Sequence, residues 1–188
     1  GDATFTNTAG SDDAITLDDA SKAFSGAVTF ATDSGSAVTI VDTTTLDLKA
    51  LTAASLSATS GGAITDSGTL AITGATTLNS GSADITLDQA SSTFGTLTLT
   101  GVNVAVTENA AMDLGASTIS GTASFSSTNN AITDSGTLAI TGVTTLNSGS
   151  ADITLDQASS TFGTLAITGA NVAVTENAAM DLGASTIS

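Results

Sequence analysis

Apolar and polar residues alternate in short runs along most of this chain. In the run 69–73, Leu70 and Ile72 are separated by small or hydroxyl-bearing residues, and the runs 96–100 and 102–106 repeat the pattern. A period of two with many β-branched residues predicts strands that are buried on one side only. Clusters of glycine, asparagine, serine and aspartate separate the runs, and these residues favour turns. The pattern therefore predicts an all-β protein built from many short strands.

A large part of the chain consists of one sequence written twice. Residues 63–120 align without a gap with residues 131–188, and 54 of the 58 pairs are identical. Near-identical copies suit a lengthened rod or a multiplied surface better than a single active site. The four exchanged pairs are small apolar or Thr/Ala changes: Ala75/Val143, Thr98/Ala166, Leu99/Ile167 and Val102/Ala170.

The repeat predicts one continuous solenoid over residues 1–188. We divide it into a diverged copy (1–62), a full unit (63–130) and a truncated unit (131–188). The diverged copy is recognised because residues 14–21 resemble residues 84–91. The sequence opens at a glycine and stops within the pattern, so we expect a piece of a longer protein.

The spacing of the runs predicts a parallel β-helix. Nine short strands in each unit group in threes, which gives coils of about 23 residues with three strands each and about eight coils in all. A propeller blade needs about 40 residues in four antiparallel strands. A sandwich would be expected to contain aromatic core residues, whereas the six aromatic residues here are all phenylalanine.

Composition excludes several classes of function. The chain has two lysines, no arginine, 18 carboxylates and a net charge of −16, so it lacks the basic surface that nucleic acids and anionic membranes require. It has no run of 18 apolar residues that would insert into a membrane. It has no histidine or cysteine, the usual ligands of zinc, haem and iron–sulfur clusters.

The segments 61–74 and 82–118 resemble the tandem β-strand repeats of large secreted bacterial adhesins of the filamentous haemagglutinin type. The resemblance rests on composition and rhythm and extends over essentially the whole chain. It implies a right-handed coil, an extracellular or cell-surface location, and a role as a stalk or an adhesive surface. The amino-terminal secretion domain of those adhesins has no counterpart in these residues, so the resemblance does not support export by their route.

Two carboxylate motifs suggest catalysis at first sight. Asp66 and Asp134 each begin an Asp-Ser-Gly-Thr sequence, as in aspartic proteases, where two carboxylates share a proton. The predicted coils place them one unit apart, roughly 14 Å along the axis, so we expect each aspartate to cap a turn instead. Glycoside hydrolysis needs two carboxylates about 5–10 Å apart, and the predicted register separates the acids. We therefore expect no enzyme activity.

Calcium is the one metal that the composition allows, because carboxylate and carbonyl oxygens are its ligands. No known calcium-loop motif is present, so the sequence favours loosely bound calcium without a dedicated cofactor. The weak candidates for calcium ligands are Asp84, Asp88, Glu108 and Asp113.

Threonines form the remaining candidate site. In the predicted register they lie on the outer side of the first strand of successive coils, where similar Thr-x-Thr rows occur in ice-binding solenoids. Threonine is also a common solvent-facing strand residue, so the alternative is that the rows carry no function. The set comprises Thr69, Thr73, Thr96, Thr98, Thr100, Thr118, Thr122, Thr137, Thr141, Thr164 and Thr168.

These observations predict a non-catalytic structural segment of a bacterial surface fibre, stalk or adhesin. Its exposed end coils are strand edges, which favour self-association end to end or laterally into filaments. The alternative is a module that binds a surface glycan or ice through the threonines.

Overall fold

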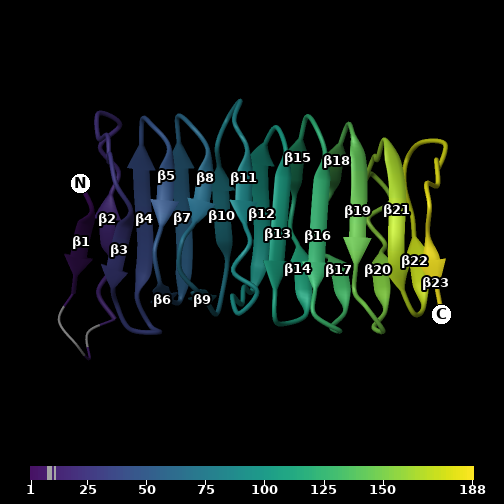
Figure 1. Ribbon diagram of the computed structural model, residues 1–188, viewed down its shortest axis with the longest axis horizontal. Helices are drawn as coiled ribbons and strands as arrows, with labels where there is room; N and C mark the ends of the chain where they lie inside the picture. The colour runs from purple at the N-terminus through teal and green to yellow at the C-terminus, as the bar shows by residue number, and fades with distance from the viewer. Residues whose placement is uncertain (8–9, 11) are drawn as a thin grey trace.

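The computed structural model describes residues 1–7, 10 and 12–188. Within this part of the chain all regular structure is β-strand, and every paired strand runs parallel to its neighbours. The strands follow one another along the long axis, so that the two termini lie at opposite ends (Figure 1). The predicted parallel β-solenoid is confirmed, with about nine coils where eight were expected.

Two long sheets form the two broad sides of the solenoid. The first sheet contains, in order, β1 (Ala3–Thr6), β3 (Val28–Ala31), β5 (Leu46–Leu48), β8 (Ile64–Asp66), β11 (Ile85–Leu87), β13 (Val104–Glu108), β16 (Ala123–Ser127), β19 (Val143–Asn147), β21 (Thr164–Gly169) and β23 (Thr186–Ile187).

The second sheet is built in the same way. Its main path contains β2 (Ile15–Leu17), β4 (Ala37–Asp42), β7 (Ser55–Ser60), β10 (Thr76–Asn79), β12 (Thr96–Gly101), β14 (Met112–Leu114), β17 (Ile132–Asp134), β20 (Ile153–Leu155) and β22 (Val172–Val174). Beside this path β12, β15 (Ser117–Ile119) and β18 (Leu138–Ile140) pair in turn, and a small separate sheet joins β6 (Leu51–Ala53) to β9 (Leu70–Ile72).

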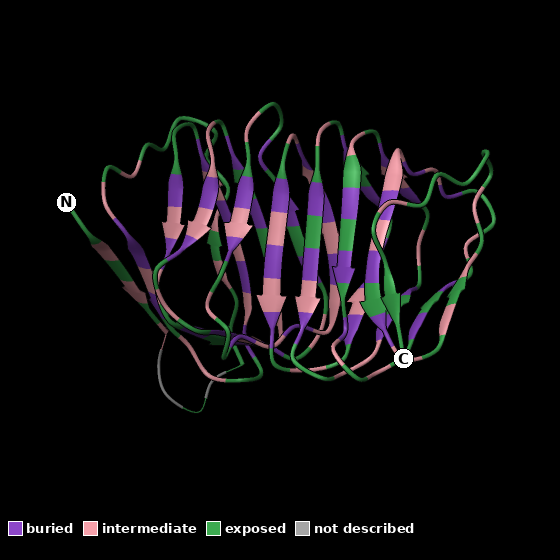
Figure 2. Cartoon of the chain, turned by 45° about the vertical axis from the view of Figure 1, so that its right-hand side comes forward, coloured by how far each residue is buried: buried purple, intermediate pink, exposed green. Residues whose placement is uncertain are grey.

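The alternation seen in the sequence separates the inside of the solenoid from the outside. In β12, Leu97 and Leu99 are fully buried, whereas the threonines between and beside them are half exposed. Buried and exposed bands alternate in this way along the strands (Figure 2). Leucine, isoleucine, valine and a few phenylalanines fill one continuous core, and burial of this apolar surface is the main stabilising contribution.

The two near-identical copies occupy opposite sheets. Ile64 lies in the first sheet, but its counterpart Ile132 lies in the second. Along the first sheet, three coils lead from Ile64 through Ile85 and Val104 to Ala123, and a further half coil reaches Ile132. One repeat unit of 68 residues is therefore three and a half coils of about 19 residues each. Successive units are related by a half turn about the axis.

The coil expected from the sequence, about 23 residues with three strands, is too long. In the structure one side of a coil can consist of two short strands, and in that prediction each short strand was counted as a side of its own. The strand β12 pairs at its start with Asp113 of β14 and near its end with Thr118 of β15. Thus β14 and β15 are two halves of one side, interrupted at Gly115 and the bend at Ala116. Serine side chains complete the hydrogen bonding at such bends: the Ser117 hydroxyl accepts the backbone N–H of Leu99 at 3.0 Å.

Neighbouring coils approach so closely at one corner that only glycine fits. A Cβ at Gly95 would lie 2.5 Å from the carbonyl oxygen of Gly74 in the adjacent coil. The backbone spacing of the stack would have to open to accept any side chain there.

Candidate functional site

The eleven threonines singled out from the sequence all lie at exposed or half-exposed positions, but they do not share one face. Thr96, Thr98 and Thr100 of β12 belong to the second sheet, and Thr118 of β15 pairs with Thr100. Strand β21, with its two threonines, belongs to the first sheet. The half turn between the repeats explains this division, because it moves equivalent residues to opposite sides.

The structure forms a different hydroxyl row, on the second sheet. Its register pairs Thr16 with Thr39, Thr39 with Ser57, Ser57 with Thr77, and Thr77 with Thr98. Five successive coils therefore present a hydroxyl at the same outward position, and we call these five residues the hydroxyl row. Only Thr98 was predicted from the sequence; the alternation also marks the other four as outward residues, but the register was needed to align them.

The first sheet presents a less regular row. From Thr65 it continues through Thr86, Ala105, Ser124 and Thr145. Alanine interrupts the hydroxyl groups, so this side offers a mixed surface of methyl and hydroxyl groups.

The two Asp-Ser-Gly aspartates lie in different sheets, Asp66 in β8 and Asp134 in β17, three and a half coils apart. Each accepts a hydrogen bond from a backbone N–H in the next coil: Asp88 donates to Asp66 at 2.9 Å, and Asp156 donates to Asp134 at 2.8 Å. Burial raises the pKa of Asp66 to about 6 and also raises the pKa of Asp134. Their observed role is to cap the backbone of the neighbouring coil.

A second type of buried carboxylate lies at the end of β13. Glu108 at the end of β13 is fully buried, and neither carboxylate oxygen makes a hydrogen bond of normal geometry among the described residues, although the nearby backbone N–H of Phe94 partly favours the charged form. Burial raises the pKa of Glu108 to about 8. At the equivalent place in the second copy, the backbone N–H of Phe162 donates to Glu176 at 3.2 Å. Glu108 is enclosed by the stacked coils and is not accessible to a substrate.

The four calcium candidates are dispersed. Asp84 accepts two hydrogen bonds from Asn103, both at 3.0 Å. Asp113 accepts one from the Thr96 hydroxyl at 2.7 Å and one from the Ser135 hydroxyl at 2.8 Å. Asp88 follows β11 on the surface, and Glu108 is in the interior. Among the described residues, no three acidic side chains converge to form a metal site.

The acidic surface predicts a strong response to salt. Both lysines pair with aspartates, Lys22 with Asp19 at 3.2 Å and Lys49 with Asp2 at 2.9 Å. The net charge is −16, so the other acidic side chains repel one another along the rod. We expect the melting temperature to rise with sodium chloride and with millimolar calcium, because ions screen this repulsion. Thermal unfolding followed by circular dichroism tests this, and a flat or falling melting temperature would contradict it. Magnesium at equal ionic strength is the control for specific calcium binding.

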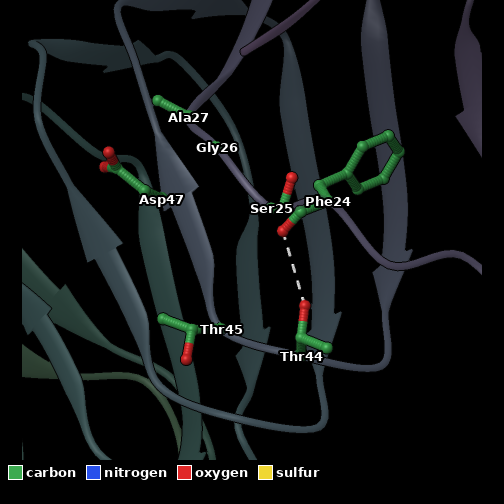
Figure 3. A pocket seen from close by; sticks show the side chains of 7 residues that line it. All are labelled: Phe24, Ser25, Gly26, Ala27, Thr44, Thr45 and Asp47. Carbon is green, nitrogen blue, oxygen red and sulfur yellow. Dashed lines mark hydrogen bonds between the residues drawn. The ribbon is translucent and has the colours of Figure 1, made fainter. Parts of the chain in front are cut away.

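A depression of about 480 Å³ lies near the N-terminal end. Its lining comes from the segment 24–27 and from Thr44, Thr45 and Asp47 (Figure 3). The Thr44 hydroxyl donates to the Phe24 carbonyl at 3.4 Å across one side. Asp47 is the only ionisable residue among the lining residues that the structure describes, and these include neither a nucleophile–base pair nor a carboxylate pair.

In the part of the chain that the structure describes, no helix has the length and apolar character required to cross a membrane. A family model described as "Repeats of unknown function (DUF5649)" matches residues 35–100 and again residues 101–168. The two matches follow each other directly and together cover more than half of the chain. Searches of curated proteins and of solved structures give no match.

Proposed function

Because this chain belongs to the family of repeats of unknown function (DUF5649) and folds as a parallel β-solenoid, we propose that it is a non-catalytic structural segment that extends a bacterial surface fibre or stalk. The observation that carries the proposal is the half-turn relation between the copies. Each unit adds three and a half coils and rotates the next unit by half a turn, so repetition lengthens the rod and presents equivalent sequence alternately on both sides.

The interior supports a mechanical role. The apolar core is continuous from coil to coil, and neighbouring coils are joined by parallel strand pairing on both broad sides. In such a stack each coil is stabilised chiefly by its nearest neighbours, and length grows with the number of repeats. A cell-surface location and an adhesive role, as in the filamentous haemagglutinin-like adhesins, are parts of the proposal.

Length provides the test. Inserting one further copy of residues 63–130 between residues 130 and 131 should lengthen the particle by about 17 Å, at roughly 4.8 Å per coil, with an unchanged cross-section. Small-angle X-ray scattering and averaged electron micrographs measure both dimensions. A particle that becomes thicker, or whose length stays constant, would contradict the rod.

The hydroxyl row favours a second candidate function, which is binding to a periodic ligand such as a surface glycan or ice. Thr77 lies inside the row, between Ser57 and Thr98. The change Thr77→Lys should abolish retention on a glycan array or the inhibition of ice growth, whereas Thr145→Lys on the first sheet should leave it unchanged. Equal activity of both variants, or no binding by the unmodified protein, would exclude the row as a binding surface.

A further inference from the structure

The depression between the second and third coils is bordered by Asp47 of β5 (Figure 3). The sequence Leu-Asp-Leu of β5 corresponds to Met-Asp-Leu of β14, so the counterpart of Asp47 in the first repeat copy is Asp113. Both aspartates accept a hydrogen bond from a serine hydroxyl of the following coil, Asp47 from Ser67 at 2.9 Å and Asp113 from Ser135 at 2.8 Å. The internal repeat therefore provides a matched reference for the depression.

The two aspartates differ on the side of the preceding coil. There the Thr96 hydroxyl donates to Asp113 at 2.7 Å, and the second copy repeats this contact at 2.8 Å. The pairing of β3 with β5 matches that of β12 with β14 and places Ala27 in the position of Thr96. Alanine has no hydroxyl, and among the described residues the Oδ1 atom of Asp47 is buried without a hydrogen-bond partner. The place therefore lacks the hydroxyl that both repeat copies supply.

One additional residue lengthens the preceding coil at the same place. The sequence Phe-Gly-Thr-Leu of both repeat copies becomes Phe-Ser-Gly-Ala-Val at 24–28, so Ser25 has no counterpart. The corner begins with the same backbone hydrogen bond as in the repeat, here from the N–H of Thr43 to the carbonyl of Lys22 at 2.8 Å. The longer segment forms one wall of the depression, whose volume of about 480 Å³ lies in the range of small-molecule sites.

The lining favours a small neutral molecule that carries hydroxyl groups. The donor that this place lacks is a hydroxyl, and the Thr44 and Thr45 hydroxyls beside it can each donate and accept a hydrogen bond. The Asp47 carboxylate and the net charge of −16 disfavour an anion. A neutral sugar residue has the required properties, because its several hydroxyl groups both donate and accept and it has no charge.

We propose that this depression binds a neutral sugar residue, one hydroxyl of which donates to Asp47 as Thr96 donates to Asp113 in the repeat. The site lies on the first sheet, whereas the hydroxyl row lies on the second. The inference rests on the proposed surface location only for the source of the sugar, a surface glycan. Binding is measured on the isolated chain, and the rod is tested separately by its change in length.

Nuclear magnetic resonance titration of the isotope-labelled chain tests the inference. The probes are the methyl glycosides of glucose, galactose, mannose and N-acetylglucosamine. At least one of them should cause saturable shifts of the backbone amides of Gly26, Thr45 and Asp47, and Thr77→Lys in the hydroxyl row should leave these shifts unchanged. The absence of saturable shifts with all four probes, or shifts confined to other parts of the chain, would overturn the inference.

Restoring the hydroxyl of the repeat gives the sharpest variant. Ala27→Thr should weaken sugar binding by about tenfold or more, because the chain itself then makes a hydrogen bond to a charged group. The matched control Ala105→Thr, at a half-exposed position of β13 in the same sheet, should leave binding unchanged. Sugar binding that is equally tight in Ala27→Thr and Ala105→Thr would overturn the inference.

A second pair of variants tests the carboxylate itself. Asp47→Asn should weaken binding, whereas Asp113→Asn should not, because Asp113 already accepts two hydroxyl groups of the chain. Circular dichroism checks that all variants fold, and this pair decides the question if Ala27→Thr does not. Equal losses of binding in Asp47→Asn and Asp113→Asn would show that Asp47 does not contact the sugar.

Discussion

The change Phe125→Ala should remove about 3–5 kcal/mol of folding free energy. Phe125 is the largest of the fully buried side chains, with 1% of its surface exposed. It lies in the middle of the first sheet, between Val106 and Leu146 of the neighbouring coils. Its removal leaves a cavity in the core between the two sheets. The strand that carries it is paired with a neighbour on both edges, so the backbone does not readily move to fill the cavity.

Urea denaturation followed by circular dichroism measures the effect. Ser124→Ala is the matched control, because Ser124 precedes Phe125 in β16 and is exposed, and a surface change of this kind costs within about 0.5 kcal/mol. Since coils are coupled chiefly to their neighbours, the variant should also unfold in two steps, with the regions on either side of the cavity losing structure separately. A loss no larger than that of Ser124→Ala would contradict the continuous core.

The sequence was sufficient to predict the class of fold. Alternation in runs such as 96–100 identified which side chains point inward, and Leu97 and Leu99 are buried as expected. Stacking followed from the long sequence repeat. The number of strands per coil could not be predicted from the sequence. An interruption such as the one at Gly115 and Ala116 looks the same in sequence whether it separates two sides of a coil or divides one side into two strands. Only the pairing of β12 with both β14 and β15 distinguishes the two cases.

The candidate surface was less predictable for the same reason. The outward orientation of Thr98 follows from alternation alone. Its neighbour in space, Thr77, depends on the residue count of the intervening coil, and an error of a few residues per coil places a different residue beside it. Interior carboxylates were a second omission: Glu108 was considered only as a calcium ligand, although its place two residues after Val106 in an alternating strand already indicated an inward side chain.

That buried glutamate makes stability depend on pH in an unusual direction. The pKa of Glu108 is raised from an ordinary value of 4.5 to about 8 by burial. Between these two pH values the folded protein keeps the proton that the unfolded chain releases, so folding becomes less favourable as pH rises. The contribution is fully present below about pH 4.5 and is lost by about pH 8. Asp66, with its pKa raised to about 6, acts in the same direction.

The change Glu108→Gln should remove most of this dependence. The amide is neutral at every pH, so the variant and the unmodified protein should be about equally stable near pH 4.5. At pH 8 to 9 the variant should be more stable by several kcal/mol, with an upper limit of about 5 kcal/mol set by the shift in pKa. Urea denaturation across this pH range measures the difference.

Glu176→Gln is the matched control, since Glu176 has the same place in the second copy but is partly exposed and accepts the Phe162 hydrogen bond. It should change the pH profile much less. Lowering the pH also protonates other carboxylates, and the smaller net negative charge stabilises the rod. Each Gln variant removes one carboxylate, so this general effect of charge is the same in both variants. A difference between Glu108→Gln and Glu176→Gln that grows with pH therefore isolates the cost of a charge buried between stacked coils. Parallel profiles would mean that the Glu108 carboxylate reaches water in the folded protein.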